Sequence, residues 1–135
     1  HPVDRRQRQM CIRDSNKGQL IKLSVIKNIK SKKGKIIWEN KFETSKIIDR
    51  QIANKLNYLL ENSVEGGTGL AASIEGRKIF GKTGTSDQNK DLWFIGSIKN
   101  LTTGIWIGFD DNRATNLSSG TSANFWRTYI ESINI

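Results

Sequence analysis

The segment Gly81-Lys-Thr-Gly-Thr-Ser86 constrains the fold of this chain more than any other. It overlaps Arg77 to Thr85, which we interpret as a β-strand, and Trp93 to Lys99 is a second predicted strand. Because Gly84 has no side chain, another extended backbone can lie against the first strand and pair with it. The segment therefore predicts a strand that borders a site for an extended chain.

The residues before this segment predict a hairpin and a helix. Gln19 to Ile26 and Lys35 to Glu39 are strand-like, and the turn Lys32-Lys-Gly-Lys35 lies between them, so we expect them to pair. Apolar residues then recur at helical spacing, and Gly66-Gly67 ends the helix. Asp49, in the expected first turn, suits the helix dipole. The apolar positions are Ile48, Ile52, Leu56, Leu59, Leu60 and Val64.

The residues after it predict a third strand and a second helix. Gly104 to Phe109 is strand-like, and a turn over Asn100 to Thr103 joins it to the preceding strand. We expect Thr121 or Ser122 to cap the last helix, whose apolar face comprises Phe125, Trp126, Tyr129, Ile130 and Ile133. This order favours an α+β fold, an antiparallel sheet with packed helices, and places the tryptophans in its core.

Composition excludes several kinds of site. The one cysteine, Cys11, excludes an internal disulfide and a cysteine-cluster metal site, and the one histidine, the terminal His1, argues against a Ser-His-Asp triad. The net charge of +9 is compatible with a polyanionic partner such as nucleic acid, an anionic membrane or an acidic wall polymer. It is equally compatible with AT-rich coding, which the scatter of the lysines along the chain favours.

The first residues differ from the rest of the chain. His1 to Ser15 uses arginine where the remainder uses mainly lysine, and it resembles a translated sequencing-adapter read-through. We therefore expect a non-native lead over 1–15 and one domain portion over 16–135. No apolar run approaches the length of a membrane span, and no apolar stretch follows the basic start, so neither a signal peptide nor a transmembrane segment is predicted.

Four motifs together resemble one family: Gly66-Gly-Thr-Gly-Leu-Ala-Ala72, Lys82-Thr-Gly-Thr85, Asp91-Leu-Trp-Phe-Ile-Gly96 and Gly104-Ile-Trp-Ile-Gly-Phe-Asp-Asp111. With them, residues 16–135 resemble the C-terminal part of the transpeptidase domain of class A (bifunctional) penicillin-binding proteins. The resemblance implies a fragment of the serine β-lactamase/penicillin-binding transpeptidase fold. In the intact parent it implies a serine-type D,D-transpeptidase that cross-links D-Ala-D-Ala stem peptides of peptidoglycan by acyl transfer and binds β-lactams.

The same resemblance implies where the parent acts and what it needs. It places the intact protein at the periplasmic face of the bacterial inner membrane, attached only through an N-terminal anchor that is missing here. No metal, organic cofactor or nucleic-acid partner is expected.

The resemblance also assigns site residues. Lys82 corresponds to the active-site lysine, and Thr83 and Thr85 correspond to the hydroxyl residues that hold the carboxylate of the substrate or β-lactam. The Thr85 amide corresponds to an oxyanion donor. The implied catalytic residues are thus Lys82 and Thr85, the substrate-binding residues are Thr83, Gly84, Thr85 and Ser86, and there is no metal ligand.

The nucleophile is expected elsewhere. Ser24-Val-Ile-Lys27 matches the Ser-x-x-Lys pattern, but it lies in a strand-like run rather than at a helix start. Ser122-Ala-Asn124 matches Ser-x-Asn but follows Lys82, whereas the family's motif precedes it. We interpret both as chance matches and expect the nucleophilic serine upstream of residue 16, so that this chain alone is inactive.

Two alternatives of other classes remain open. One is a non-catalytic cell-wall peptide-binding module that uses the same strand. The other is a P-loop nucleotide or nucleic-acid binder, because Gly76 to Thr83 fits GxxxxGK[ST] literally. A phosphate loop requires a helix that begins at the lysine, whereas Gly84 and the poor helix formers Ser-Asp-Gln-Asn follow Lys82 here.

Overall fold

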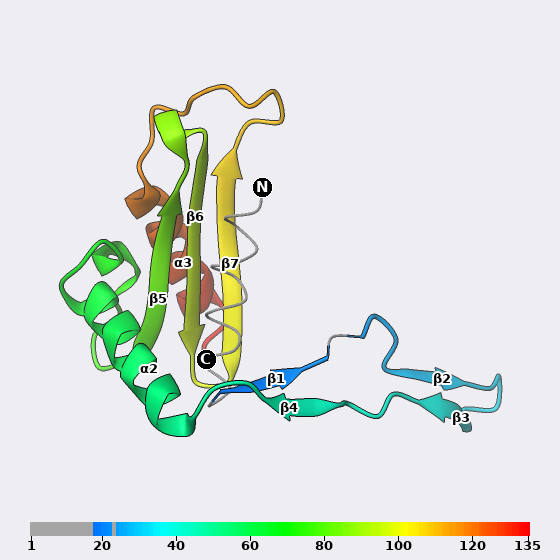
Figure 1. Cartoon of the computed structure of the whole chain (residues 1–135). Helices are drawn as coiled ribbons and strands as arrows, with labels where there is room; N and C mark the ends of the chain where they lie inside the picture. The colour runs from blue at the N-terminus through cyan, green and yellow to red at the C-terminus, as the bar shows by residue number, and fades with distance from the viewer. Residues whose placement is uncertain (1–17, 23) are drawn as a thin grey trace.

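The computed structural model describes residues 18–22 and 24–135, and a long arm projects from a body of sheet and helices (Figure 1). We call residues 18–46 the arm and residues 47–135 the body. The arm contains β1 (Gln19–Ile21), β2 (Asn28–Lys30), β3 (Ile36–Glu39) and β4 (Thr44–Lys46). The body contains α2 (Arg50–Glu65), η1 (Leu70–Ala72), β5 (Ile79–Thr85), η2 (Asp87–Asn89), β6 (Asp91–Ile98), β7 (Leu101–Gly108) and α3 (Ser119–Ser132).

The body is a three-stranded antiparallel sheet, in the order β5-β6-β7, on which the helices pack. This arrangement confirms the predicted α+β class. The turn between β6 and β7 is shorter than the predicted Asn100 to Thr103, because Ile98 already pairs with Leu101. Lys99, one of the two residues left in the turn, has a φ of 50°.

Phe94 and Trp126 hold the sheet on α3. The two rings meet edge to face with centroids 5.4 Å apart, and the Trp126 Nε1 donates a hydrogen bond of 2.7 Å to the Thr103 Oγ1 on β7. Gly96 makes room for both rings, since a Cβ at this position would lie 2.7 Å from each. The core around them comprises Val64, Ala72, Ile79, Phe94, Ile98, Ala123, Trp126 and Ile130.

The predicted first helix is confirmed, with a correction at its start. It ends at Glu65, directly before Gly66, as predicted. Asp49 is the N-cap rather than a first-turn residue, and its side chain makes no capping bond. Its carboxylate instead accepts a hydrogen bond from the Lys46 Nζ, and this bond and the lysine charge lower the pKa of Asp49.

The last helix differs from the prediction in its cap and in its face. It is capped by Ser118 and begins at Ser119, so the predicted cap at Thr121 or Ser122 is wrong. Its buried face contains Trp126 and Ile130 but also Ser122, whose hydroxyl donates to the Ser119 carbonyl and so needs no further partner. Phe125 and Tyr129 are exposed, so the predicted single apolar face is wrong.

The predicted pairing of the arm is also wrong. β3 pairs with β2, not with residues 19–26, and β1 pairs with β4, a strand that the sequence pattern did not predict. The turn itself decides the register. Ser31 N donates to Lys35 O at 2.8 Å, and Gly34 takes a φ of 80°, so the chain reverses within five residues and brings Asn28–Lys30 opposite β3.

The tryptophans do not all belong to the core. Trp126 is fully buried, but Trp38 on the arm and Trp106 on β7 are 44% and 43% exposed. Trp93 lies between these extremes and contacts Trp106 with ring centroids 6.4 Å apart. The prediction that all four are core residues is therefore wrong. Trp38 lies on the arm, away from α3, and strand residues of the central sheet alternate between two faces, of which only one meets α3.

The contact around Gly96 can be tested by adding one methyl group. We expect Gly96→Ala to lower the free energy of unfolding by about 1–3 kcal/mol, because the rings of Phe94 and Trp126 must move. The matched control is Gly104→Ala, where the nearest atom lies 3.5 Å from the added Cβ. Urea unfolding of both variants measures the difference, and equal midpoints would contradict the proposed packing.

Candidate functional site

β5 is an edge strand that carries the predicted site residues. It pairs with β6 on one side, and its other edge faces no strand of the described part of the chain. Lys82 and Thr85 are exposed, whereas Thr83 is only 5% exposed. The strand therefore offers unpaired backbone groups and an exposed cation along the same edge, which an extended ligand can use together.

Three neutral oxygen atoms hold the Lys82 ammonium group. Its Nζ donates to the backbone oxygen and the Oγ1 of Thr83, each at 3.0 Å, and to the Thr68 Oγ1 at 3.3 Å. The ion pairs within the described residues do not include Lys82. The charge is thus fixed in place without being neutralised, which suits a site for an anionic group.

Thr68 is a site residue whose role the sequence did not indicate. Its hydroxyl accepts a hydrogen bond of 2.9 Å from the Thr83 Oγ1 and also contacts Lys82. The glycines on either side let the loop cross the end of α2, because a Cβ at Gly67 or Gly69 would lie about 3 Å from the Ser63 carbonyl oxygen. The signal in the sequence was the Gly-Thr-Gly pattern itself, which marks a loop forced close to another backbone.

Phe94 joins this loop to the strand. A Cβ on Gly81 would lie 2.5 Å from the Phe94 ring, and a Cβ on Gly69 would lie 3.4 Å from it. The ring therefore lies against both the Thr68 loop and β5, next to Lys82. Phe94 thus packs between the loop that carries Thr68 and the strand that carries Lys82.

The far end of the site is built around Ser86 and Asn89. The Ser86 Oγ accepts a hydrogen bond of 2.7 Å from the Asp91 amide, and this bond closes the turn between β5 and β6. Thr115, on the loop that follows β7, donates from its amide and its hydroxyl to the Asn89 carbonyl at 3.0 and 2.7 Å. Both bonds fix the turn that begins where Thr85 ends the strand.

The structure thus divides the predicted residues into two groups. Lys82 and Thr83 gather around Thr68, whereas Thr85 and Ser86 lie at the end of the strand. Gly84 lies between them, opposite Trp93 on β6. The described residues contain no cluster of histidine, cysteine, aspartate and glutamate that could hold a metal ion.

The phosphate-loop alternative is wrong. Lys82 lies inside β5, which continues to Thr85, and the three-residue η2 begins only at Asp87. In the part of the chain that the structure describes, no helix begins at Lys82, and the backbone amides that would cradle phosphate in such a loop belong to a strand.

The two chance matches lie in unsuitable places. Ser24 lies between β1 and β2 on the arm, and its hydroxyl donates to the Ile26 carbonyl at 2.9 Å. Ser122 is fully buried on α3. Neither serine is among the hydrogen-bond partners of Lys82.

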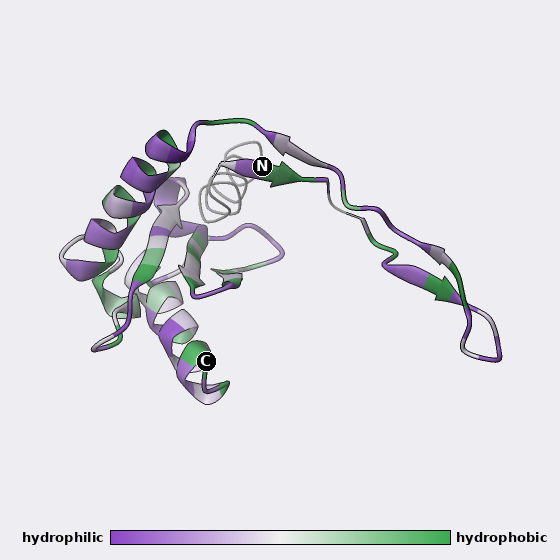
Figure 2. Ribbon diagram, turned by 90° about the horizontal axis from the view of Figure 1, so that it is seen from below, coloured by the Kyte–Doolittle hydropathy of each residue, from purple (hydrophilic) through white to green (hydrophobic). Residues whose placement is uncertain are grey.

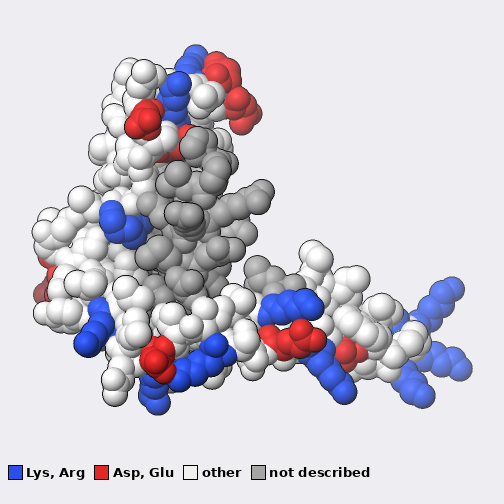
Figure 3. All heavy atoms as spheres, in the orientation of Figure 1, with Lys and Arg blue, Asp and Glu red and all other residues white. Residues whose placement is uncertain are grey.

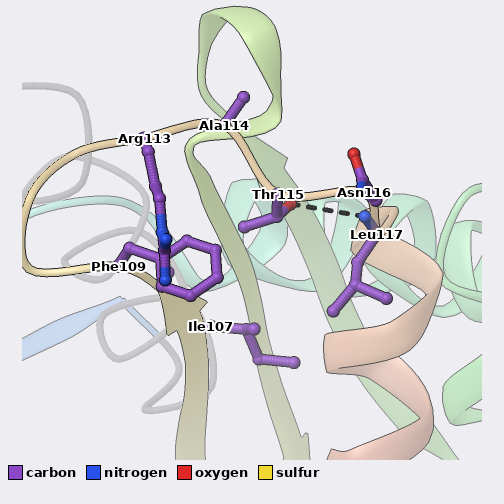
Figure 4. A pocket seen from close by; sticks show the side chains of 8 residues that line it. Ile107, Phe109, Arg113, Ala114, Thr115, Asn116 and Leu117 are labelled. Atoms are coloured by element: carbon purple, nitrogen blue, oxygen red, sulfur yellow. Dashed lines mark hydrogen bonds between the residues drawn. The ribbon is translucent and has the colours of Figure 1, made fainter.

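A separate pocket of about 480 Å³ lies where β7 ends (Figure 4). Its wall is mainly apolar, and the Arg113 guanidinium lies 3.8 Å from the centroid of the Phe109 ring. Thr115 belongs to the wall, but its hydroxyl is engaged with Asn89. The pocket includes none of the residues around Lys82, so it is not the site of the predicted chemistry.

Comparison with known proteins agrees with the motifs. The family model described as penicillin binding protein transpeptidase domain matches residues 9–126. Penicillin-binding protein 1B of Vibrio cholerae is 33% identical over 111 residues, which are 81% of this chain and 14% of that protein. Penicillin-binding protein 1A of Clostridium tetani is 41% identical over 99 residues, which are 71% of this chain and 12% of that protein.

Solved structures show the same fold. Penicillin-binding protein 1A of Haemophilus influenzae superimposes with a TM-score of 0.76 at 22% identity, over 90% of this chain and 25% of that chain. Penicillin-binding protein A of M. tuberculosis, solved as an imipenem acyl-enzyme complex, gives 0.73 at 20% identity, over 91% and 29%. The chain thus spans only a small part of the proteins that it matches.

The buried threonine can be tested by removing its hydroxyl. We expect Thr83→Val to lower the free energy of unfolding by about 1 kcal/mol, because Thr68 loses a buried hydrogen-bond partner and Lys82 loses one of its acceptors. Thr85→Val, on the same strand but exposed, should leave the unfolding midpoint unchanged. If both variants unfold at the midpoint of the original chain, the Thr68–Thr83–Lys82 arrangement does not contribute to stability.

Proposed function

Because the chain belongs to the penicillin-binding protein transpeptidase family, we propose that β5 and the Thr68 loop form one wall of a serine D,D-transpeptidase site. The observation that supports this most directly is the Lys82 ammonium group, which three neutral oxygens hold at the open edge of a strand. An extended stem peptide ending in D-Ala-D-Ala can pair with that edge, and Gly84 leaves room for it.

We assign the site residues as follows. Lys82 provides fixed positive charge for the substrate carboxylate and for proton transfer at the serine, and Thr83 positions Lys82 through its hydroxyl. The exposed Thr85 side chain binds the carboxylate, and its amide stabilises the developing oxyanion. Gly84 and Ser86 complete the substrate-binding wall, with Ser86 acting through the turn that it closes.

The reaction is an acyl transfer in two steps. A serine hydroxyl attacks the carbonyl between the two D-Ala residues, gives up its proton and expels the terminal D-Ala. An amine of a neighbouring stem peptide then attacks the ester and releases the serine. We place the nucleophilic serine and the Ser-x-Asn motif in a segment outside residues 16–135, so this chain supplies binding and electrostatics rather than the nucleophile.

The remaining properties of the parent are part of the same proposal. We expect the intact protein to bind β-lactams covalently and to act at the periplasmic face of the inner membrane. Within the described residues, neither α2 nor α3 has the length and apolarity needed to span a bilayer. We also propose that residues 1–15 are a non-native lead. The family match begins at residue 9, inside this segment, so it leaves the end of the lead open. Sequencing the source DNA upstream of the codon for Asn16 tests where the native sequence begins.

A second function is favoured by the Lys82 arrangement itself. A fixed ammonium group beside an unpaired strand edge can bind the carboxylate and backbone of a wall peptide without any acyl transfer. As a non-catalytic module, this chain alone would bind D-Ala-D-Ala peptides weakly and would lose that binding on Lys82→Ala. An NMR titration that shows no binding excludes it.

The proposed site is tested in a longer form of the protein that includes the upstream serine. We expect Lys82→Ala to slow acylation by a fluorescent penicillin by about a hundredfold or more, since it removes charge from the reacting centre. Lys90→Ala is the matched control, a lysine of the same hairpin that lies beyond β5, and it should acylate at the original rate. Equal rates for both variants would remove Lys82 from the site.

The chain as it stands gives a complementary result. We expect no covalent labelling of the 135-residue chain by the same penicillin, because no residue of it is proposed as the nucleophile. Gel fluorescence and intact mass are the measurements. Labelling at any serine, Ser24 in particular, would show that the nucleophile lies within this chain.

A further inference from the structure

The positive charge of the chain is concentrated on the arm. Residues 18–46 contain eight lysines and two glutamates, a net charge of +6, whereas residues 47–135 contain nine basic and nine acidic residues and are neutral. Figure 3 shows the lysines gathered at the far end of the arm, away from the body. These eight lysines already lie within one stretch of 29 residues, and the fold holds that stretch away from the neutral body (Figure 1).

The lysines at the tip of the arm form no ion pair with the described residues. Four lysines lie on or beside the turn between β2 and β3, and the ion pairs of the described residues involve none of them: Lys30, Lys32, Lys33 and Lys35. The pair between Lys22 and Glu43, 3.4 Å apart, lies at the base instead. The tip therefore presents uncompensated charge to a partner.

The same arm exposes large apolar side chains. Ile37 is 68% and Phe42 is 56% exposed, and Ile29 lies directly opposite Trp38 in the β2–β3 ladder, so their side chains share one face. Figure 2 shows apolar segments along the arm, far from the sheet and α3. A two-stranded ladder is marginally stable in water by itself, so contacts with a partner would stabilise it.

Charge and apolar surface together select the partner. Nucleic acids and phosphate-rich wall polymers can neutralise lysines, but they leave isoleucine side chains in water. The surface of an anionic bilayer offers negatively charged headgroups and hydrocarbon within a few ångströms of each other. Tryptophan is enriched at that boundary, because its ring is apolar and its N–H is polar.

We propose that the arm binds the surface of a membrane that contains anionic phospholipid. The tip lysines contact the headgroups, while Trp38 and the neighbouring isoleucines enter the boundary with the acyl chains. This contact is independent of the proposed acyl-transfer site, because the arm contains none of the residues around Lys82.

Vesicle co-sedimentation of the full chain tests the charge. We expect binding to vesicles in which about a third of the lipid is phosphatidylglycerol, no binding to pure phosphatidylcholine, and weakening by salt. A triple lysine-to-glutamine variant of the tip should bind at least tenfold more weakly, since each lysine near an anionic surface contributes about fivefold. Its substitutions are Lys30→Gln, Lys32→Gln and Lys33→Gln.

A body variant provides the matched control. It carries the same charge change at three exposed or half-exposed lysines of residues 47–135 and should bind as the original chain does: Lys55→Gln, Lys90→Gln and Lys99→Gln. Equal loss of binding in both triple variants would show that net charge matters and the arm does not, and it would overturn the proposal.

Apolar substitutions distinguish a lipid surface from other polyanions. Ile37→Gln with Trp38→Gln keeps every charge, and we expect it to weaken vesicle binding at least tenfold while leaving the unfolding of the body unchanged. Trp38→Phe should abolish the blue shift of tryptophan emission on vesicles without removing binding. If the double variant binds vesicles as tightly as the original chain, or if an oligonucleotide binds more tightly than the vesicles, the arm is a polyanion site and the membrane proposal fails.

Discussion

The packing of the Phe94 ring against two facing glycines is the contact on which the rest of the body depends. Gly81 and Gly96 are partners in the β5–β6 ladder, and a Cβ on either would collide with this ring. The ring also meets Trp126 edge to face and lies against the Gly69 loop. One aromatic side chain thus ties α3, the two strands and the Thr68 loop into a single unit.

This packing explains the position of Lys82. The lysine follows Gly81, so the close approach of Phe94 to the strand places its backbone beside the loop that carries Thr68. The Thr83 hydroxyl then links the two, with Oγ1 to Oγ1 at 2.9 Å. A neutral hydrogen-bonded pair, in which Thr83 is buried and Thr68 exposed, supports an exposed cation, and no carboxylate among the described residues forms an ion pair with that cation.

The described part of the arm has no buried core like that of the body. Its ladders have only three or four residues per strand, and they leave large apolar side chains in contact with water. The body, by contrast, is electrically neutral and holds the buried core. The division between the two is therefore one of charge as well as of shape (Figures 1 and 3). The proposed acyl-transfer site lies on the body, and the proposed contact with a charged surface lies on the arm.

Local signals in the sequence sufficed for the three central strands, for α2 and for the family. Alternation, the Gly-Gly stop and the Lys-Thr-Gly-Thr motif depend on residues close together in the chain, and these predictions are confirmed as elements. The pairing within the arm was not predictable in this way. By composition, residues 19–26 could pair with β3 as well as β2 does. The tight turn at Gly34 decides between the two segments, because it brings β2 opposite β3.

The sequence by itself determined the three strands of the central sheet, where α2 ends and which family the motifs belong to, because each depends on local composition and spacing. Only the tertiary structure decided that Ser122 is buried while Phe125 is 57% exposed, that Thr68 reaches Lys82, and that residues 18–46 project from the body (Figure 1). The reason is physical: these outcomes depend on which segments pack together, and packing brings together residues that lie far apart in the chain.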